Sequence, residues 1–398
     1  MSDMVSVPVT IYRGGTSKAL VFRPENLPDD PDERDRVILA AYGSPDPRQI
    51  DGMGGADSLT SKMAIIGKSR RSEVDVDYTF GQVSLFNATV DYSGNCGNIS
   101  SAVGPFAIDE GLIPAVEPVT TVRIFNTNTK KVIAAEVPVE NGRPKVDGDF
   151  SIDGVPGTGA RIVLNFLDSA GSVTGKLLPT GCAKDVIETS HGKFTVSFVD
   201  SANPVIFVGG EELGIKGTEL PDEINANSIL TETLEEIRGI FAVKIGCVND
   251  WKIAKAVSPA VPKICFVSKA QTYTASDGRI IRDDEIDIVG RMMSMQRPHK
   301  AYAVTGAVCT GTAAKIPGSV VYDLLSEEAK RRNQIRIGHP SGKLEVEVDV
   351  EQVNGNTILH KAALARTARR LMDGRVYVSS AKVVSMKLET PSKKKTDE

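Results

Sequence analysis

The chain has 398 residues, of which 41% are hydrophobic and 25% charged, a composition typical of a globular protein. This length predicts two domains of roughly 150–200 residues each. A net charge of −4 gives no electrostatic footprint for nucleic acid, and no 18-residue apolar run predicts a membrane span.

The cysteines and histidines are arranged without the spacing of a metal site. The five cysteines form no CxxC pair, and the four histidines include no HExxH pattern. A disulfide framework and a structural zinc site are therefore not expected. The first residues lack a charged region followed by a long apolar one, so we expect no signal peptide and a cytoplasmic, metal-free protein.

The chain begins with an alternating strand pattern at residues 5–12, and a second strand is expected at 19–22. The sequence between them, Arg-Gly-Gly-Thr-Ser-Lys at 13–18, offers a guanidinium, two hydroxyls and several backbone N–H groups. That set suits a carboxylate, which arginine can bind with two hydrogen bonds. A surface hairpin with no ligand is the alternative.

A helix is expected at residues 31–42, followed by a glycine-rich segment at 52–61 and then by Lys62. Lys62 directly precedes the apolar run 63–66, which reads as a buried strand. A lysine at the mouth of such a strand loses part of its hydration, which favours acid–base catalysis. The alternative is a lysine whose stem is covered while its ammonium reaches solvent.

We place the chemistry in the stretch 91–104, where Cys96 lies between Gly94 and Gly97. A helix beginning near Asn98 would aim its free N–H groups and the positive end of its dipole at Cys96. That field stabilises a thiolate and attracts a carboxylate. A buried structural cysteine in a glycine-rich turn is the alternative. The helix, extending to about residue 110, is apolar over much of its surface and should be buried.

The second half of the sequence shows a similar pattern of glycine turns, strands and a small-residue helix. Residues 305–318 predict another glycine turn, containing Cys309 and opening a second helix of small residues. Residues 283–295 show helical spacing of apolar side chains, and 367–374 predict a turn or short helix. The charged end of the chain is expected to be disordered.

Four polar glycine turns, at 13–18, 54–62, 93–98 and 306–312, could line one cleft. They offer many neutral donors and few cations, which suits a small polycarboxylate. With Cys96 and Lys62 as proton carriers, an isomerase or racemase is the leading class. A carboxylate-binding protein without turnover is one alternative. A hydrolase with Cys96 as nucleophile and His339 as base is weaker, because no triad-like spacing is visible.

The ordered motifs resemble those of the PrpF-like isomerases over about residues 5–378. A closer likeness to the 3-methylitaconate Δ-isomerases of that family lies in residues 46–52, 75–80, 97–100, 126–129 and 152–157. The motifs shared with the whole family are RGGTSK at 13–18, GSPD at 43–46, DGMGG at 51–55, TSK at 60–62, SGNCGN at 93–98, GTAA at 311–314, IPG at 316–318 and GHPSG at 338–342.

The resemblance implies an α/β, diaminopimelate-epimerase-like fold of two domains, each a curved and mostly antiparallel sheet wrapped around a central helix. We place these domains at residues 1–187 and 188–380, with a disordered tail at 381–398. The family's catalytic pair, a lysine and a cysteine, falls on Lys62 and Cys96, and no catalytic role is assigned to Cys309. The resemblance further implies no cofactor and a homo-oligomer, either a dimer or a tetramer.

The implied activity moves a C=C bond in a small unsaturated di- or tricarboxylate by allylic proton transfer. The expected reaction converts 3-methylitaconate to 2,3-dimethylmaleate. The alternatives are cis-trans isomerisation of 2-methylaconitate and Δ-isomerisation of aconitate. The expected carboxylate-binding residues are Arg13, Thr16, Ser17, Ser61, Asn95, Gly97 and Asn98, with Thr312 and Ser341 as weaker ones from the second domain.

Overall fold

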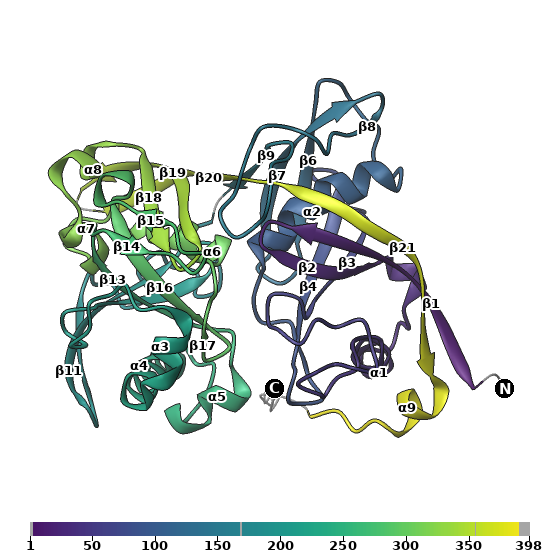
Figure 1. Ribbon diagram of the computed structural model, residues 1–398, viewed down its shortest axis with the longest axis horizontal. Coiled ribbons are helices and arrows are strands. Elements are labelled where there is room, and N and C mark those ends of the chain that lie inside the picture. The colour runs from purple at the N-terminus through teal and green to yellow at the C-terminus, as the bar shows by residue number, and fades with distance from the viewer. Residues whose placement is uncertain (1–2, 168, 355, 390–398) are drawn as a thin grey trace.

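The computed structural model describes residues 3–167, 169–354 and 356–389. The chain forms two halves that lie side by side, each with strands curved around one helix (Figure 1). The strands of the first half are β1 (Met4–Gly14), β2 (Ser17–Phe22), β3 (Lys62–Lys68), β4 (Val76–Val83), β5 (Val90–Asp91), β6 (Val119–Asn126), β7 (Lys131–Glu140), β8 (Arg143–Pro144) and β9 (Ile162–Leu167). Its helices are η1 (Pro24–Asn26), α1 (Pro31–Tyr42) and α2 (Gly97–Asp109).

The second half follows the same plan with more covering helices. Its strands are β10 (Asp185–Thr189), β11 (Gly192–Asp200), β12 (Pro204–Gly209), β13 (Lys263–Lys269), β14 (Tyr273–Thr274), β15 (Ile280–Ile281), β16 (Ile288–Ser294), β17 (Arg297–Pro298), β18 (Gln334–His339) and β19 (Gly342–Val353). Its helices are α3 (Pro221–Ala226), α4 (Ser228–Lys244), η2 (Trp251–Ile253), α5 (Ala254–Val257), η3 (Asp283–Glu285), α6 (Val304–Ala313), α7 (Val320–Leu324) and α8 (Glu327–Arg331).

The strands of both halves pair mostly antiparallel. The parallel pairs are β2 with β3 and β4 with β6 in the first half, and β12 with β13 and β16 with β18 in the second. The other pairs in the large sheet are antiparallel. The expectation of two domains with curved, mostly antiparallel sheets is therefore confirmed.

Two long strands at the end of the chain, β20 (Asn356–Arg366) and β21 (Ala368–Ser379), join the halves (Figure 1). The first part of β20 pairs with β19, and its last residues pair with β9. β21 then runs antiparallel to β1 along the full length of β1. The division at residues 187/188 stays a prediction, but these pairings place residues 368–379 on the sheet of the first half.

Each half is built around one helix of small residues. In α2 every residue from Gly97 to Ile108 is buried, and in α6 every residue is buried. A Cβ on Gly104 would lie 2.6 Å from the Val137 side chain, and one on Gly311 would lie 2.5 Å from Val346. The glycines thus let the surrounding strands approach both helices closely. Both helices belong to one continuous apolar core.

Three local predictions were wrong. Residues 288–294 form strand β16 rather than a helix, because a strand covered on both faces carries apolar side chains on both faces and so loses the alternation that marks a strand. The turn expected at 305–312 lies inside α6, and residues 368–374 belong to β21. In each case packing against the sheet decided between conformations that the local sequence allowed.

The end of the described chain is partly ordered. Residues Ser380–Ser385 form helix α9, and Val383, Met386 and Leu388 pack against the core of the first half. Disorder from residue 381 onward is therefore wrong for these residues, and the rest of the expected tail, 390–398, lies outside the described residues.

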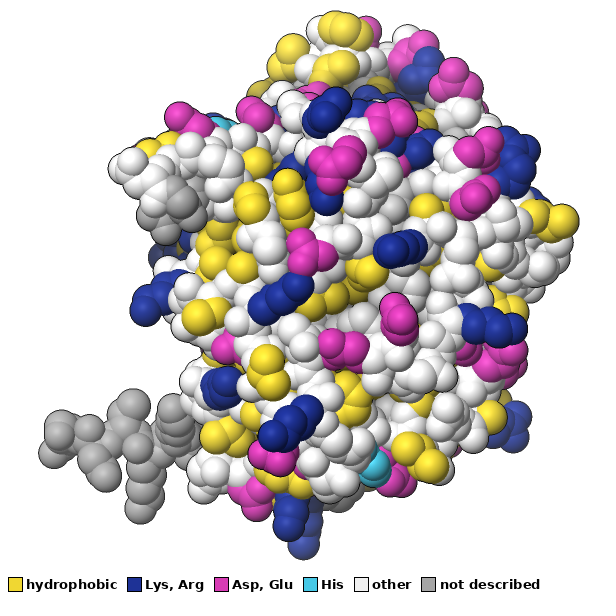
Figure 2. Space-filling model, turned by 90° about the vertical axis from the view of Figure 1, so that its left-hand side faces the viewer, with side chains coloured by type: hydrophobic (Ala, Val, Ile, Leu, Met, Phe, Trp, Pro, Cys, Tyr) yellow, Lys and Arg dark blue, Asp and Glu magenta, His cyan; other side chains and the backbone are white. Residues whose placement is uncertain are grey.

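The outer face of the second half carries lysine, arginine, aspartate and glutamate side chains interspersed with one another (Figure 2). Among the described residues, no helix is long and apolar enough to cross a membrane.

Candidate active site

A hollow of about 460 Å³, open to solvent, lies between the two halves where the first turns of α2 and α6 meet. From the first half it is lined by Lys62, Gln82 and residues 94–98. From the second half it is lined by Lys263, His299 and residues 303–305, among others. The tertiary structure thus brings Lys62 and Cys96, the two catalytic candidates, into one hollow.

Lys62 begins β3 and is only 6% exposed, although it carries an ammonium. Its Nζ donates to Gln82 Oε1 at 2.8 Å and lies 5.5 Å from the centre of the Phe80 ring. Gln82 is itself fixed, because its Nε2 donates to the carbonyls of Ser58 and Ser61. None of the ion pairs among the described residues involves Lys62. The position of the ammonium is therefore fixed, but no carboxylate of the described residues pairs with it to balance its charge.

Cys96 is the N-cap of α2, and its side chain makes no capping hydrogen bond. The N–H groups of Gly97, Asn98 and Ile99 have no acceptor among the described residues, because the first intrahelical bond runs from Ser100 N to Cys96 O. Free amides and the helix dipole therefore face the thiol and the hollow. The expected helix start is confirmed to within one residue.

The second half presents a similar helix start from the opposite side. α6 begins at Val304, and its first three N–H groups have no acceptor within the described chain. Thr305 lines the hollow, and its hydroxyl has no hydrogen-bond partner among the described residues. Two helix N-termini therefore converge on one space, which makes that space favourable for an anion with two charged ends.

Lys263, at the start of β13, is a second cation in the hollow that the sequence did not reveal. Burial, followed by the positive charge of Lys62, lowers its pKa to about 8, and this is opposed by Cys96 and Asp91. Its Nζ donates to Ala260 O at 3.2 Å, and it has no carboxylate partner among the described residues. The only sequence signal was a lysine opening an apolar run, the same pattern that marked Lys62.

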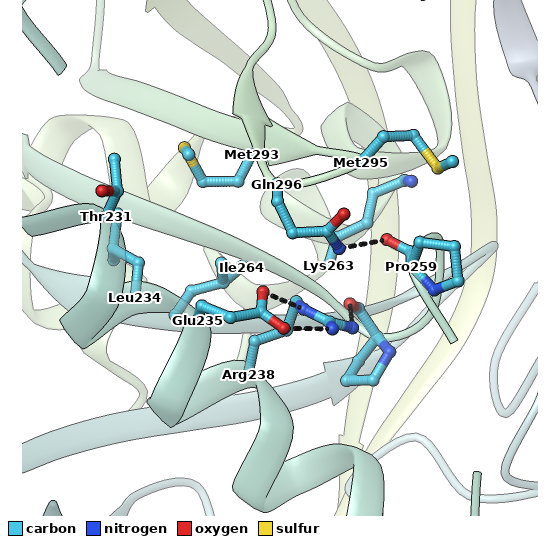
Figure 3. Close-up of a pocket in the computed structure, with 11 residues that line it drawn as sticks. Thr231, Leu234, Glu235, Arg238, Pro259, Lys263, Ile264, Met293, Met295 and Gln296 are labelled. Atoms are coloured by element: carbon cyan, nitrogen blue, oxygen red, sulfur yellow. Dashed lines mark hydrogen bonds and ion pairs between the residues drawn. The ribbon is translucent and has the colours of Figure 1, made fainter. Parts of the chain in front are cut away.

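Hydrogen bonds from Arg238 and Gln296 hold the loop before Lys263 in place, as the close-up in Figure 3 shows. Arg238, on α4, pairs with Glu235 and donates to Ser258 O at 2.7 Å and to Pro262 O at 3.4 Å. Gln296 Nε2 donates to Pro259 O at 2.9 Å. These bonds fix the backbone from which Lys263 extends toward Met295 and the hollow.

His299 is the remaining ionisable group that the second half contributes. It is buried, and burial, followed by the charges of Lys62 and Lys263, lowers its pKa to about 3. The imidazole is therefore neutral near pH 7 and adds a polar but uncharged edge to the hollow. No sequence pattern singled out this residue.

The predicted carboxylate-binding residues of the first half fall into two groups. Asn95, Gly97 and Asn98 line the hollow. The Ser61 hydroxyl is completely buried and donates to Val83 O, next to Lys62 in the chain but turned into the protein. Arg13 donates to Gly15 O and to both oxygens of Thr367, so its guanidinium holds the residue between β20 and β21 to the first hairpin.

Four predicted binding residues, two from each half, remain. The Thr16 and Ser17 hydroxyls are buried without a hydrogen-bond partner among the described residues, and Thr16 N donates to Asn98 Oδ1. The Ser341 hydroxyl donates to Lys300 O. The Thr312 hydroxyl donates to Ser201 Oγ and Val308 O near the far end of α6. None of these four lines the hollow that contains Cys96.

The other two buried cysteines, Cys265 and Cys309, lie in the part of the core that belongs to the second half. Cys309 lies in the middle of α6 and donates to Val199 O, and burial raises its pKa. Cys265 lies 3.1 Å from Tyr302 Oη, and burial raises its pKa to about 12. Both thiols are therefore protonated near pH 7. Within the described part of the chain, no cluster of three His, Cys, Asp or Glu side chains could hold a metal ion.

Solved structures support the same fold. A crystal structure of methylitaconate-delta-isomerase matches with a TM-score of 0.78 and 51% identity, covering 98% of this chain and 100% of that one. A hydroxyproline epimerase from Agrobacterium vitis, at 12% identity, shares the fold with a TM-score of 0.55 over 94% of this chain and 93% of its own.

Sequence relatives are isomerases of small carboxylates by name. The chain is 53% identical to the 3-methylitaconate isomerase of Eubacterium barkeri, with 96% of this chain and 100% of the relative covered. It is 41% identical to the 2-methyl-aconitate isomerase of Cupriavidus necator, with 94% and 97% covered. Residues 4–379 match the family described as PrpF protein. The chain therefore belongs to the PrpF family.

Proposed function

We propose that the protein is a cofactor-independent isomerase that moves the C=C bond of a small unsaturated dicarboxylate, converting 3-methylitaconate to 2,3-dimethylmaleate. The observation that carries this proposal is the composition of the hollow. Cys96 and two buried ammonium groups, Lys62 and Lys263, share it with two helix N-termini. Two cations without carboxylate partners are complementary to a dianion, because burying them unpaired is otherwise costly.

The reaction needs one proton to leave and another to return. Removal of the C3 proton, which is next to one carboxylate and to the C=C bond, leaves an electron pair that spreads into a dienolate. Protonation of the terminal methylene carbon then forms the methyl group and shifts the double bond. Lys62 and Cys96 divide these two steps, one as base and the other as acid. The order of the two groups is left open.

The substrate carboxylates are held from both halves. The free amides of Gly97 and Asn98 and the Lys263 ammonium can each bind one end of a dicarboxylate. The amides at the start of α2 also stabilise the charge of the dienolate, since preorganised donors lower the energy of a developing anion. Arg13, Thr16, Ser17, Ser61, Thr312 and Ser341 stay predictions, and the structure gives them other contacts or places them away from the hollow.

The relatives allow a second substrate. 2-Methylaconitate carries an additional carboxylate, and the 41% identical relative is named for it. One methylene in a pocket is worth only about 1–3 kcal/mol, so the choice depends mainly on whether the site offers partners to the additional carboxylate. We propose 3-methylitaconate because the relative named for that substrate has the higher identity, 53%. The homo-oligomeric state and the cytoplasmic location also remain predictions.

The proposal is tested by proton NMR in deuterated buffer with 3-methylitaconate, 2-methylaconitate and aconitate supplied separately. We expect 2,3-dimethylmaleate with deuterium in a new methyl group, and a higher kcat/KM for 3-methylitaconate than for the other acids. Cys96→Ser and Lys62→Met should each abolish turnover while leaving the unfolding temperature near that of the wild type. The proposal fails if no acid is isomerised or deuterated, and tight binding without turnover would favour a carboxylate-binding protein.

A further inference from the structure

A second cavity lies between the two halves along strand β20, which crosses from one half to the other (Figure 1). This β20 cavity is open to solvent and has a volume of about 1050 Å³. Residues 150–153 and Val163 line it from the first half, Leu344 lines it from the second, and β20 contributes residues 363–366. Among the described residues, none lines both this cavity and the hollow that contains Cys96. The reaction proposed above therefore leaves the β20 cavity without a role.

Arg366, the last residue of β20, places a buried guanidinium at the β20 cavity. The residue is only 6% exposed, and burial lowers its pKa to about 10. Its Nε donates to Asn98 Oδ1 at 3.2 Å and its Nη1 donates to Ala365 O at 2.9 Å. Nη2 has no hydrogen-bond partner among the described residues, and no ion pair between described residues includes Arg366. A buried cation with an unused donor is stabilised by an anion that binds there.

The carboxylates that line the same cavity are engaged elsewhere. Their partners are Arg279 for Asp153, Lys361 for Glu347 and Gln334 for Glu345. None of these carboxylates bonds to Arg366 within the described part of the chain. The charge of Arg366 is therefore left for a ligand to balance.

The walls of the β20 cavity favour one kind of anion. Apolar residues from both the first half and β20 line it, among them Ile152, Val163 and Leu364. One buried guanidinium balances one negative charge, whereas a phosphate group carries about −1.5 to −2 near pH 7. A carboxylate matches the planar guanidinium, and an attached carbon chain matches the apolar residues.

We propose that the β20 cavity is a second ligand site, which binds a small organic monocarboxylate with its carboxylate on Arg366 and its carbon chain against the apolar wall. The site does not depend on the proposed isomerase reaction, because none of the residues assigned to that reaction lines it. It differs from the hollow that contains Cys96 in its charge, since that hollow presents two ammonium groups and suits a dianion.

The first test is NMR of the full chain labelled with ¹⁵N-arginine, with butyrate as the probe. The Nε–H signal of Arg366 is assigned as the one missing from Arg366→Lys. Butyrate added at constant ionic strength should shift this signal along a saturating curve, and sodium chloride should leave it in place. No shift, or an equal shift with chloride, would overturn the proposal. A stronger response to inorganic phosphate than to butyrate would overturn the assignment to a carboxylate.

The second test is equilibrium dialysis with radiolabelled butyrate. Arg366→Met should weaken binding at least about 10-fold through loss of a charge-assisted hydrogen bond. The matched control is Arg161→Gln, since Arg161 lines the same cavity but is exposed, and its affinity should stay within about 5-fold of the wild type. Lys263→Met, in the other hollow, should bind butyrate as the wild type does.

Three outcomes of the dialysis would refute the second site. They are retained binding in Arg366→Met, loss of binding in Lys263→Met, and a larger loss in Arg161→Gln than in Arg366→Met. Unfolding temperatures show whether each variant is folded. If Arg366→Met does not fold, Arg366→Lys takes its place, because lysine keeps the charge but lacks the guanidinium fork, and wild-type affinity in that variant would refute the site. A wild type that isomerises no acid would refute the proposed function and leave these binding results unaffected.

Discussion

Gly97 and Val304 bring the starts of the two central helices into direct contact across the interface. A Cβ placed on Gly97 would lie 2.3 Å from Val304 Cγ1, far closer than two carbon atoms pack. Gly97 is the first residue of α2, and Val304 is the first residue of α6. The space in which the substrate would bind is therefore set by one glycine facing one valine.

Gly97→Ala should push the two halves apart at the hollow. We expect a loss of about 1–3 kcal/mol in unfolding free energy, as for other overpacked sites, and a fall in kcat/KM of at least 10-fold. Denaturant unfolding and steady-state kinetics measure the two effects. Val304→Gly in the same background removes both carbons that the added methyl group would meet, Cγ1 at 2.3 Å and Cβ at 2.7 Å, and should restore part of both. If the double variant is no better than Gly97→Ala, the contact does not control the site.

Gln82 positions the ammonium of Lys62 through the 2.8 Å hydrogen bond to its Oε1. Replacing Gln82 by Glu places a carboxylate at the same distance, which pairs the Lys62 ammonium and adds a negative charge beside the substrate carboxylates, so KM should rise. Gln82→Leu removes the acceptor and should lower kcat by about 10²-fold. A Gln82→Glu enzyme with the wild-type KM would show that the Lys62 ammonium does not attract the substrate.

Removing the Lys263 ammonium should have opposite effects on stability and on activity. Its pKa is lowered to about 8 from 10.5, so the unfolded chain binds more protons between these values and stability rises with pH across that window. Lys263→Met removes a buried, unpaired charge and should raise the unfolding temperature at pH 7. The same variant should raise KM about 30-fold or more through loss of a carboxylate partner. A Lys263→Met enzyme that is less stable, or that has a wild-type KM, would contradict this assignment.

The wild-type enzyme should also lose affinity for the dicarboxylate as Lys263 becomes neutral. Below pH 8 the ammonium is charged and attracts the substrate, and above that pH the attraction is lost. We therefore expect kcat/KM to fall as the pH rises through about 8. This limb should be absent from Lys263→Arg, because a guanidinium stays charged. Persistence of the limb in that variant would assign it to another group.

Variants of Glu235 and Arg238 test whether the hydrogen bonds from Arg238 to the loop before Lys263 affect substrate binding. Arg238 is only 2% exposed and holds the carbonyl of Ser258 at 2.7 Å. Arg238→Met should cost about 3–5 kcal/mol, as expected for breaking a buried pair, and should raise KM through displacement of the Lys263 loop. Glu235→Gln leaves the arginine bonds to the loop in place and should keep KM near the wild-type value. Equal KM values for the two variants would show that the loop does not depend on Arg238.

Local sequence was sufficient to predict features that depend only on neighbouring residues, such as helix and strand starts. Gly94 and Gly97 around Cys96, with small residues after them, predicted a buried helix starting near Asn98, and α2 starts at Gly97. Lys62 was singled out because it directly precedes the apolar run 63–66, although the same pattern at Lys263 was passed over. The motif set carried the family and the pairing of Lys62 with Cys96, which spacing alone could not provide.

Contributions from the second half depended on long-range packing. Lys263 and His299 lie more than 160 residues beyond Cys96, and no local pattern linked them to the hollow. The strand Ile288–Ser294 was mistaken for a helix because burial on both faces removes the alternation that marks a strand. The return of β21 to β1 was likewise invisible in the sequence, since strand pairing is chosen by the assembled sheet.

The sequence by itself determined three local features of the candidate site: a thiol at a helix start, a lysine at the start of a strand and glycines that allow close approach. The tertiary structure decided which groups line the hollow, and beside Cys96 and the expected Lys62 it placed Lys263, His299 and two opposed helix starts. The physical reason is one of range. Helix starts and glycine turns follow from neighbouring residues, whereas the charge balance of a buried hollow depends on every segment that folds around it.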